Sequence, residues 1–174
     1  MKAILVFVDG TICDTRARHH LIGTPDLYQR ERILDDQAVP GSVKCLNELS
    51  ERYEIVYIGA RPASARLSTE EWLEQMEFPK GALYLAESQE GRLSLVKEMS
   101  GKFDFIAGIG DRWDDNELHT ELGCLSIILE EYKGKWREVF NRIDTYHRHW
   151  KIEANRIHLK GKIEGLARVC PLLL

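Results

Sequence analysis

The stretch AILVFVDGT, residues 3–11, decides the fold. Its first six residues are apolar and rich in β-branched side chains, which is typical of a strand buried on both faces by helices. The stretch GIGDRWDDN, residues 108–116, likewise follows an apolar run and carries carboxylates. Because ligands collect at the carboxyl ends of the strands in an open parallel sheet, we expect Asp9, Asp111 and Asp115 to meet in one crevice.

Strand-like and helix-like segments alternate along most of the chain. Apolar runs predict strands over residues 3–8, 54–58, 82–85, 103–109 and 125–129. Helical spacing and cap residues, among them Pro40 and Ser68 or Thr69, predict helices over residues 40–52, 68–78, 93–99 and 118–122. This alternation predicts an α/β fold with a doubly wound, parallel, Rossmann-like sheet in which the first strand is central.

Two segments depart from this alternation. Residues 14–37 are polar and predict a small, cap-like helical insertion after the first strand. We assign residues 1–130 to a core domain and residues 131–174 to a helical extension packed on it. The extension carries an apolar stripe at helical spacing: Trp136, Val139, Phe140, Ile143, Tyr146 and Trp150. We expect this stripe to pack on the sheet of the same chain, and the alternative is a surface for a partner or a homo-oligomer.

Composition narrows the class of protein. The chain has 174 residues, of which 44% are hydrophobic and 30% charged, and this suits a globular domain with a full core. A net charge of −4 disfavours binding to long duplex nucleic acid. The four cysteines form no C-x-x-C pair, which argues against zinc and favours free thiols in a reducing compartment. The N-terminal apolar run is too short for a membrane span, so we expect a cytoplasmic protein without membrane contact.

The two acidic motifs predict a magnesium site formed by Asp9, Asp111 and Asp115. The four-residue spacing of Asp111 and Asp115 suits direct and water-mediated ligation of Mg²⁺. Without a cation, their mutual repulsion in a partly buried site would amount to several kcal/mol at most. A second interpretation is that the run from Asp114 to Asn116 only caps a helix and compensates its dipole.

Residues near the first acidic motif are candidates for binding a phosphate monoester. Gly10 lets the backbone approach a ligand, and the amides of Gly10 and Thr11 suit phosphate oxygens. Arg18 and His19 belong to a basic cluster that would grip an anionic substrate beside the crevice. The alternative for this cluster is a charged loop face.

A second group of candidates follows the strand over residues 54–58. Gly59, Ala60 and Arg61 form the turn after this strand, and Arg61 would hold a phosphate bidentately or simply shape the turn. Lys97 precedes the strand that leads to the second acidic motif, so it would lean over the crevice and neutralise phosphate charge. The alternative for Lys97 is a solvated surface residue.

Taken in order, these motifs resemble those of the haloacid dehalogenase (HAD) superfamily of phosphohydrolases over roughly residues 1–130. Within that superfamily, the pattern is similar to the 3'-phosphatase domain of bacterial and phage polynucleotide kinases. The residues that carry this narrower likeness are Asp9-Gly10-Thr11-Ile12-Cys13-Asp14, Arg18-His19, Arg61-Pro62, Arg66, Thr69, Trp72 and Leu73. The resemblance implies Mg²⁺ as a cofactor, Asp9 as general acid/base, Lys97 as the family's lysine, and Asp111 with Asp115 as metal ligands.

Two positions depart from the pattern that the resemblance implies. Phe7 stands where the family has its aspartate nucleophile, and Gly59 stands where a serine or threonine contacts the phosphate. A phenyl ring cannot form an acyl phosphate or ligate Mg²⁺. A shift that makes Asp9 the nucleophile resembles the transport ATPases of the superfamily, but it places Ile12 where a glycine is expected.

Three hypotheses follow, and whether the chain is an enzyme stays open between them. The first is a pseudoenzyme that keeps a Mg²⁺ and phosphate-monoester pocket for a nucleotide-like ligand, with weak or no turnover. The second is an active phosphohydrolase, acting on a nucleotide or a nucleic-acid 3'-phosphate end, that uses Asp9 or a metal-bound water. The third is an interaction protein that acts through its C-terminal helical tail.

Overall fold

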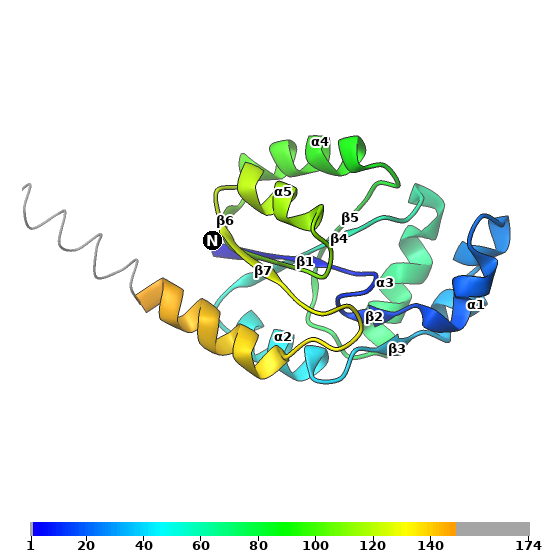
Figure 1. Ribbon diagram of the computed structural model, residues 1–174, viewed down its shortest axis with the longest axis horizontal. Coiled ribbons are helices and arrows are strands. Elements are labelled where there is room, and N and C mark those ends of the chain that lie inside the picture. The colour runs from blue at the N-terminus through cyan, green and yellow to red at the C-terminus, as the bar shows by residue number, and fades with distance from the viewer. Residues whose placement is uncertain (1, 149–174) are drawn as a thin grey trace, which may run out of the picture.

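A parallel sheet of five strands forms the centre of the molecule (Figure 1). The computed structural model describes residues 2–148. The strand order is β5-β4-β1-β6-β7, and all four pairings are parallel. The strands are β1 (Lys2–Phe7), β4 (Glu54–Gly59), β5 (Gly81–Leu85), β6 (Asp104–Gly110) and β7 (Leu125–Ile128). The predicted α/β fold with a central first strand is confirmed.

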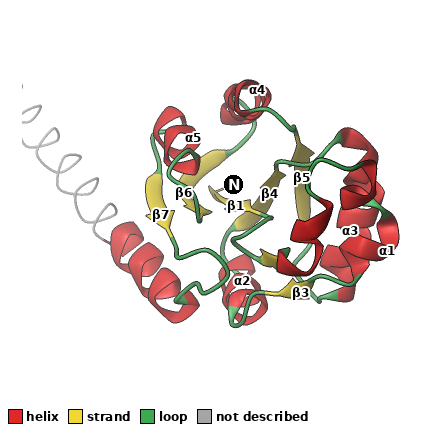
Figure 2. Cartoon of the chain, turned by 45° about the vertical axis from the view of Figure 1, so that its right-hand side comes forward, coloured by secondary structure: helices red, strands yellow, loops and turns green. Residues whose placement is uncertain are grey.

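Helices cover both faces of this sheet (Figure 2). They are α2 (Ser42–Ser50), α3 (Arg66–Gln75), α4 (Gln89–Ser100), α5 (Asp115–Glu121) and a helix over residues 136–148. Alternate side chains of β1 point to opposite faces, as the pleat requires. Ile4 and Val6 pack with α2, α3 and the helix over residues 136–148, whereas Leu5 and Phe7 pack with α4 and α5. The molecule therefore has three layers with two apolar cores.

The insertion after β1 folds back along the carboxyl edge of the sheet. It contains β2 (Cys13–Asp14), two short 3₁₀ helices, η1 (Arg16–Leu21) and η2 (Pro25–Tyr28), then α1 (Arg30–Leu34) and β3 (Gln37–Ala38). The strands β2 and β3 pair antiparallel. This brings the two ends of the insertion together, so the helical part projects as one unit over the strand ends.

The helix after β4 begins earlier than the sequence predicts. A 3₁₀ turn, η3 (Ala63–Ala65), leads directly into α3, so Ser68 and Thr69 lie inside the helix and cap nothing. The Thr69 hydroxyl is buried, donates to the Ala65 carbonyl at 2.8 Å and accepts from Arg61. Thr69 therefore makes its hydrogen bonds within α3 and to Arg61, and the helix starts before both of the predicted cap residues.

The described part of the C-terminal extension packs on the core. Trp136, Val139 and Ile143 are each at most 3% exposed and belong to the same apolar cluster as β1. Trp150, also in the predicted stripe, lies outside the described residues. A partner or oligomer surface on this helix stays a prediction. Within residues 2–148, no helix is both long and apolar enough to cross a membrane.

Candidate functional site

A cavity of about 490 Å³ opens at the carboxyl edge of the sheet. Its wall is built by the ends of β1, β4 and β6, by the insertion and by the loop after β7. The predicted residues that line it are Asp9, Gly10, Arg18, His19, Gly59, Ala60, Asp111 and Asp115. Parallel strands thus bring motifs about a hundred residues apart to one crevice, as the sequence suggested.

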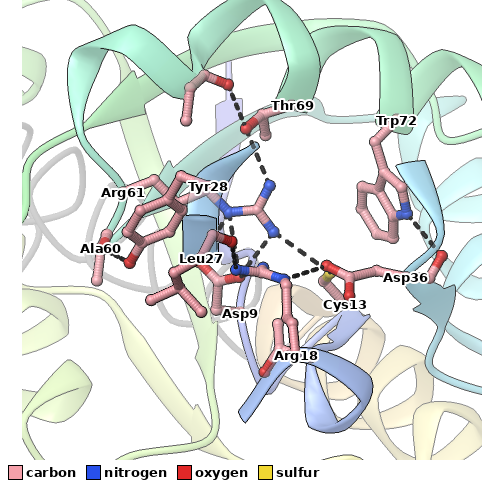
Figure 3. A network of polar contacts seen from close by, with 12 residues as sticks. Asp9, Cys13, Arg18, Leu27, Tyr28, Asp36, Ala60, Arg61, Thr69 and Trp72 are labelled. Carbon is pink, nitrogen blue, oxygen red and sulfur yellow. Dashed lines mark hydrogen bonds and ion pairs between the residues drawn. The ribbon is translucent and has the colours of Figure 1, made fainter. Parts of the chain in front are cut away.

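Asp9 is held by two arginines (Figure 3). Arg61 donates from Nη2 to Asp9 Oδ1 at 2.7 Å and from Nε to Oδ2 at 3.0 Å, and Arg18 Nη2 donates to Oδ1 at 3.1 Å. Burial by itself raises the pKa of Asp9, but the two guanidiniums outweigh it and the pKa lies below its ordinary value. Asp9 is therefore kept as a carboxylate, which is unfavourable for a group that must donate a proton.

Arg61 lies beneath the crevice and not in its wall. It is fully buried, and besides Asp9 it donates to Thr69 Oγ1 at 2.9 Å and Cys13 Sγ at 3.3 Å. The expectation that Arg61 reaches a bound phosphate is wrong, because its guanidinium is used inside the protein. The sequence placed Arg61 at the correct strand end, but it could not show that Asp9 and Thr69 would enclose it.

Arg18 joins the insertion to the same network (Figure 3). Its Nε donates to Asp36 Oδ2 at 2.8 Å, and its Nη1 donates to the Leu27 carbonyl at 3.1 Å. The Trp72 indole donates to the backbone carbonyl of Asp36 at 2.9 Å, which ties this part of the insertion to α3. Asp9, Asp36, Arg18 and Arg61 form a buried group with balanced charge, so its first role is structural.

Asp111 and Asp115, unlike Asp9, do not form hydrogen-bonded ion pairs with arginines within residues 2–148. Asp111 Oδ1 accepts from the Thr11 hydroxyl, and Asp111 Oδ2 is buried without a partner within residues 2–148. Asp115 Oδ2 accepts from the amides of Asp111 and Arg112 at 3.1 and 3.0 Å. Burial raises the pKa of Asp111 to about 7 and that of Asp115 to about 6. These carboxylates lack a protein cation of the kind that Asp9 has.

The metal ligands predicted from the sequence are only partly assembled. No group of three or more His, Cys, Asp or Glu side chains in the described chain is arranged to hold a metal ion. Asp9 does not join Asp111 and Asp115 as a ligand, because its two oxygens face arginines. The remaining pair fits Mg²⁺ that is completed by phosphate and water, since Mg²⁺ often takes one or two carboxylates in such sites. The unpartnered Asp111 Oδ2 is the atom that such an ion would satisfy.

Gly10 makes the close approach of Asp111 possible. A Cβ atom at this position would lie 2.4 Å from Asp111 Oδ2, and the φ of +83° is in the left-handed region. Both facts require glycine here. The acidic turn after β1 is thus shaped around the Asp111 carboxylate.

Phe7 ends β1 at the floor of the crevice. It is 6% exposed and packs in the apolar core beneath α4 and α5, with its ring edge-to-face to His119 at a centroid distance of 5.7 Å. Burial lowers the pKa of His119 to about 4, so this histidine is neutral at physiological pH. At the position of Phe7, the floor beside Asp9 is therefore apolar and uncharged.

The crevice has a buried cation other than the predicted lysine. Lys97 lies near the C-terminal end of α4 with its side chain 63% exposed, 4.0 Å from Glu121, and it does not line the cavity. The expectation that Lys97 leans over the crevice is wrong, because α4 runs back from the strand ends and carries Lys97 away.

Arg92, in the first turns of the same helix, lines the crevice and is 7% exposed. Its position one turn after the Ser88 cap is the signal that sequence reasoning missed.

Ala60 and Gly59 do lie at the crevice. The Ala60 carbonyl accepts from the Tyr28 hydroxyl at 3.1 Å, which connects the turn after β4 to the insertion. A Cβ at Gly59 would lie 3.0 Å from the end of the Leu85 side chain. Space for a small side chain at Gly59 therefore depends only on a shift of that flexible group.

A family comparison matches residues 6–109 to the family described as PITM 1-3, LNS2 domain. The chain belongs to this LNS2 family. The matched part of this LNS2 domain includes Phe7, Asp9, Arg18 and Arg61 and ends just before Asp111. No curated protein matches the chain.

Solved structures show the same fold at low sequence identity. A chain of the Pnkp1/Rnl/Hen1 complex matches with a TM-score of 0.57 and 19% identity, and the match covers 75% of this chain and 46% of that chain. The class C acid phosphatase from Bacillus anthracis matches with a TM-score of 0.57 and 21% identity, and the match covers 85% of this chain and 78% of that chain. A HAD family enzyme from Bacteroides thetaiotaomicron matches with a TM-score of 0.51 and 10% identity, and the match covers 80% of this chain and 99% of that chain. That enzyme was solved as an aspartate-to-alanine mutant with magnesium and inorganic phosphate.

These likenesses concern the fold, because all three identities are low. This LNS2 domain spans less than half of the Pnkp1-complex chain that it matches. Other matches include further haloacid dehalogenase-like proteins. The LNS2 domain therefore has the HAD-like phosphohydrolase fold that the motif order indicated.

Proposed function

We propose that this LNS2 domain binds a phosphate monoester together with Mg²⁺ and hydrolyses it slowly or not at all. The observation that carries the proposal is Phe7. Its ring is packed at the strand end beside Asp9, where the family resemblance places a nucleophilic carboxylate. Loss of a nucleophile from a catalytic group that works as a unit costs on the order of 10⁶ in turnover.

The state of Asp9 supports the same conclusion. A general acid must carry a proton at the working pH, and the pKa of Asp9 is lowered by Arg61 and Arg18 after their charges overcome its burial. Protonation would also break the ion pairs that hold Arg18 and Arg61. The crevice therefore lacks an attacking group at Phe7 and holds its remaining acid in the wrong protonation state.

Charge in the crevice supports cation-dependent binding of phosphate. Six carboxylates and three arginines line it: Asp9, Glu87, Asp111, Asp114, Asp115 and Glu131, with Arg18, Arg92 and Arg112. A phosphate dianion that entered alone would be repelled by this excess of negative charge. Asp111 and Asp115 would hold Mg²⁺, which when bound supplies the positive charge that phosphate needs.

Arg92 is proposed as the protein cation on the phosphate. Three of its donor contacts go to the Ala86 and Glu87 carbonyls and to Gln89, at 2.7 to 3.1 Å. Its Nε is buried without an acceptor in the described part of the chain. An anion in the crevice would give that N–H a charge-assisted partner.

The proposal is tested by measuring binding and turnover on the same protein. Calorimetric titration with inorganic phosphate is expected to show binding by the wild type with Mg²⁺ and much weaker binding with EDTA. Hydrolysis of p-nitrophenyl phosphate is expected to be near background. Turnover is expected to appear in Phe7→Asp, because the new carboxylate can attack phosphorus and p-nitrophenolate leaves without needing a protonated Asp9. It is not expected in the matched variant Phe7→Asn, because an amide is not a nucleophile of this kind.

Folding of the Phe7 variants must be checked, since removal of a buried ring costs roughly 3–5 kcal/mol. Circular dichroism and urea unfolding of Phe7→Asp and Phe7→Asn provide this control. Rapid wild-type hydrolysis of p-nitrophenyl phosphate or of a 3'-phosphorylated oligonucleotide, abolished by Asp9→Asn, would overturn the proposal in favour of an active phosphohydrolase. Failure of the wild type to bind phosphate with Mg²⁺ would remove the binding function itself.

A further inference from the structure

Three polar side chains meet at the rim of the crevice and have no part in the function proposed above. The Tyr132 hydroxyl lies 2.9 Å from His19 Nε2 and 3.1 Å from Thr15 Oγ1, and Thr15 Oγ1 lies 3.3 Å from His19 Nε2. All three residues line the cavity. We call Thr15, His19 and Tyr132 the rim triad. It joins the insertion to the loop after β7.

The backbone places the rim triad next to the phosphate end of the crevice. The Tyr132 amide donates to the Gly10 carbonyl at 2.9 Å, and Gly10 is the residue against which the Asp111 carboxylate lies. Tyr132 has a φ of +61°, a left-handed conformation that is unfavourable for a bulky residue. Such strain persists where the surroundings fix it, often at ligand sites. The Tyr132 backbone is thus held beside Gly10 and Asp111, and Tyr132 lines the same crevice as these two residues.

The chemistry of the rim triad suits a hydroxyl group. The two hydroxyls can each donate and accept hydrogen bonds, and His19 Nε2 donates or accepts according to its tautomer, so the triad offers both kinds of partner to a ligand. The charges nearby do not favour a second anion, because Arg16, which lies over the Tyr132 ring, is paired with Asp14, and Glu131 lies next to Tyr132. A neutral group that donates and accepts is the best match to this site.

We propose that the rim triad recognises a hydroxyl on the alcohol part of the bound phosphate monoester, so that the crevice selects polyol phosphates over alkyl phosphates. This inference rests on the proposed function, because it names the substrate class of the same site. The Tyr132 hydroxyl is the specificity-determining group, and Thr15 and His19 are positioning residues that orient it.

The test compares two esters that differ only in hydroxyl groups, glycerol 1-phosphate and n-propyl phosphate, each titrated in the presence of Mg²⁺. The wild type is expected to bind glycerol 1-phosphate more tightly by about 2- to 13-fold, the range given by one neutral hydrogen bond. Tyr132→Phe keeps the ring and removes the hydroxyl, so it is expected to erase this preference. The affinity for inorganic phosphate, which lacks the alcohol part, is measured on the same variant and is expected to fall less than the affinity for glycerol 1-phosphate.

Tyr146→Phe is the matched control, because Tyr146 lies on the C-terminal helix and not at the crevice. Thr15→Val is a second variant and is expected to reduce the preference in part. Equal affinity of the wild type for the two esters, or a preference that survives in Tyr132→Phe, would overturn the inference. Absence of inorganic phosphate binding in the wild type would instead show that the proposed function has failed, so the two failures are distinguishable.

Discussion

Asp9 and Asp111 follow neighbouring strands of one sheet and line one crevice, yet the protein treats their charges in opposite ways. Asp9 has two arginines within hydrogen-bond distance, and its pKa is lowered. Asp111 has a threonine on one oxygen and nothing on the other within the described residues, and burial raises its pKa to about 7. The protein itself neutralises the first carboxylate, whereas the second can be neutralised by a proton or by a cation from solution.

This difference separates a structural role from a binding role within one pocket. Asp9 stabilises the junction between the first motif, the turn after β4 and the insertion through Arg18 and Arg61. Asp111 retains an unsatisfied oxygen that stabilises nothing in the free protein. A sequence motif that places both aspartates at strand ends cannot distinguish these roles, because the partner charges come from other parts of the chain.

The largest effect is expected from removing the arginine partner of Asp9. Arg61→Met would leave Asp9 with only Arg18 and would leave the buried Thr69 hydroxyl without its donor. Breaking a buried ion pair on one side costs roughly 3–5 kcal/mol, so we expect a loss of this size in the free energy of unfolding. Urea denaturation measures it.

Arg52→Met provides the matched control. Arg52 also pairs with an aspartate, Asp144, at 3.1 Å, but its side chain is 46% exposed. An exposed pair is worth about 0–1 kcal/mol, so this variant should unfold close to the wild type. If both variants lost equal stability, the structural role assigned to the Asp9 network would be wrong.

A smaller effect is expected from the cation on the other side of the crevice. Arg92→Gln removes the buried cation whose charge acts on Asp115. The affinity for inorganic phosphate in the presence of Mg²⁺ should fall by about 10- to 150-fold, which corresponds to one charge-assisted hydrogen bond.

Lys97→Gln serves as the comparison for Arg92→Gln, since both residues lie on α4. Phosphate affinity should change less than about twofold, because an exposed charge on the far part of the helix is screened by solvent. A larger loss in Lys97→Gln than in Arg92→Gln would restore the lysine that the family resemblance suggested. Unfolding curves must accompany the titrations, because Arg92 also binds loop carbonyls.

The smallest effect is a pH dependence of stability. Below the ordinary pKa of 3.8, Asp111 is protonated in the folded and unfolded states alike and contributes nothing. As the pH rises from about 4 to about 7, the unfolded chain releases its proton first, so the free energy of unfolding falls, on the order of 1–2 kcal/mol after solvent screening. The pKa of Asp9 is lowered in the folded protein, so its contribution to the free energy of unfolding has the opposite pH dependence. That contribution is lost as the pH falls below 3.8.

The measurement compares wild type with Asp111→Asn by urea unfolding at pH 4.5 and 7.5. The wild type should lose more stability over this interval than the variant, since the amide does not titrate. Mg²⁺ should restore part of the loss at pH 7.5 and less at pH 4.5, because metal ligands must be deprotonated. Identical pH slopes for the two proteins would contradict the unsatisfied state assigned to Asp111.

Individual residues show which features of the fold and the site the local sequence pattern could predict. The apolar run that ends at Phe7 predicted a central parallel strand, because a short run rich in β-branched residues is typical of a strand covered on both faces. Asp9 and Asp111 were correctly expected at one crevice, since parallel strands share an edge. Lys97 was misplaced because sequence distance from a strand does not give direction along a helix. Arg92 was not singled out because its position one turn after the Ser88 cap was overlooked, and Tyr132 was not singled out because it has no local motif.

The sequence by itself determined the α/β architecture, the order of the acidic motifs and the presence of a phenyl ring at the end of β1. These features depend on the pattern of neighbouring residues, which the chain carries locally. Only the tertiary structure decided that Arg18 and Arg61 enclose Asp9, that an oxygen of Asp111 is left unpartnered, and that Tyr132 meets His19. Burial and pairing of charges arise between segments up to more than a hundred residues apart, and they set the protonation state on which the chemistry depends.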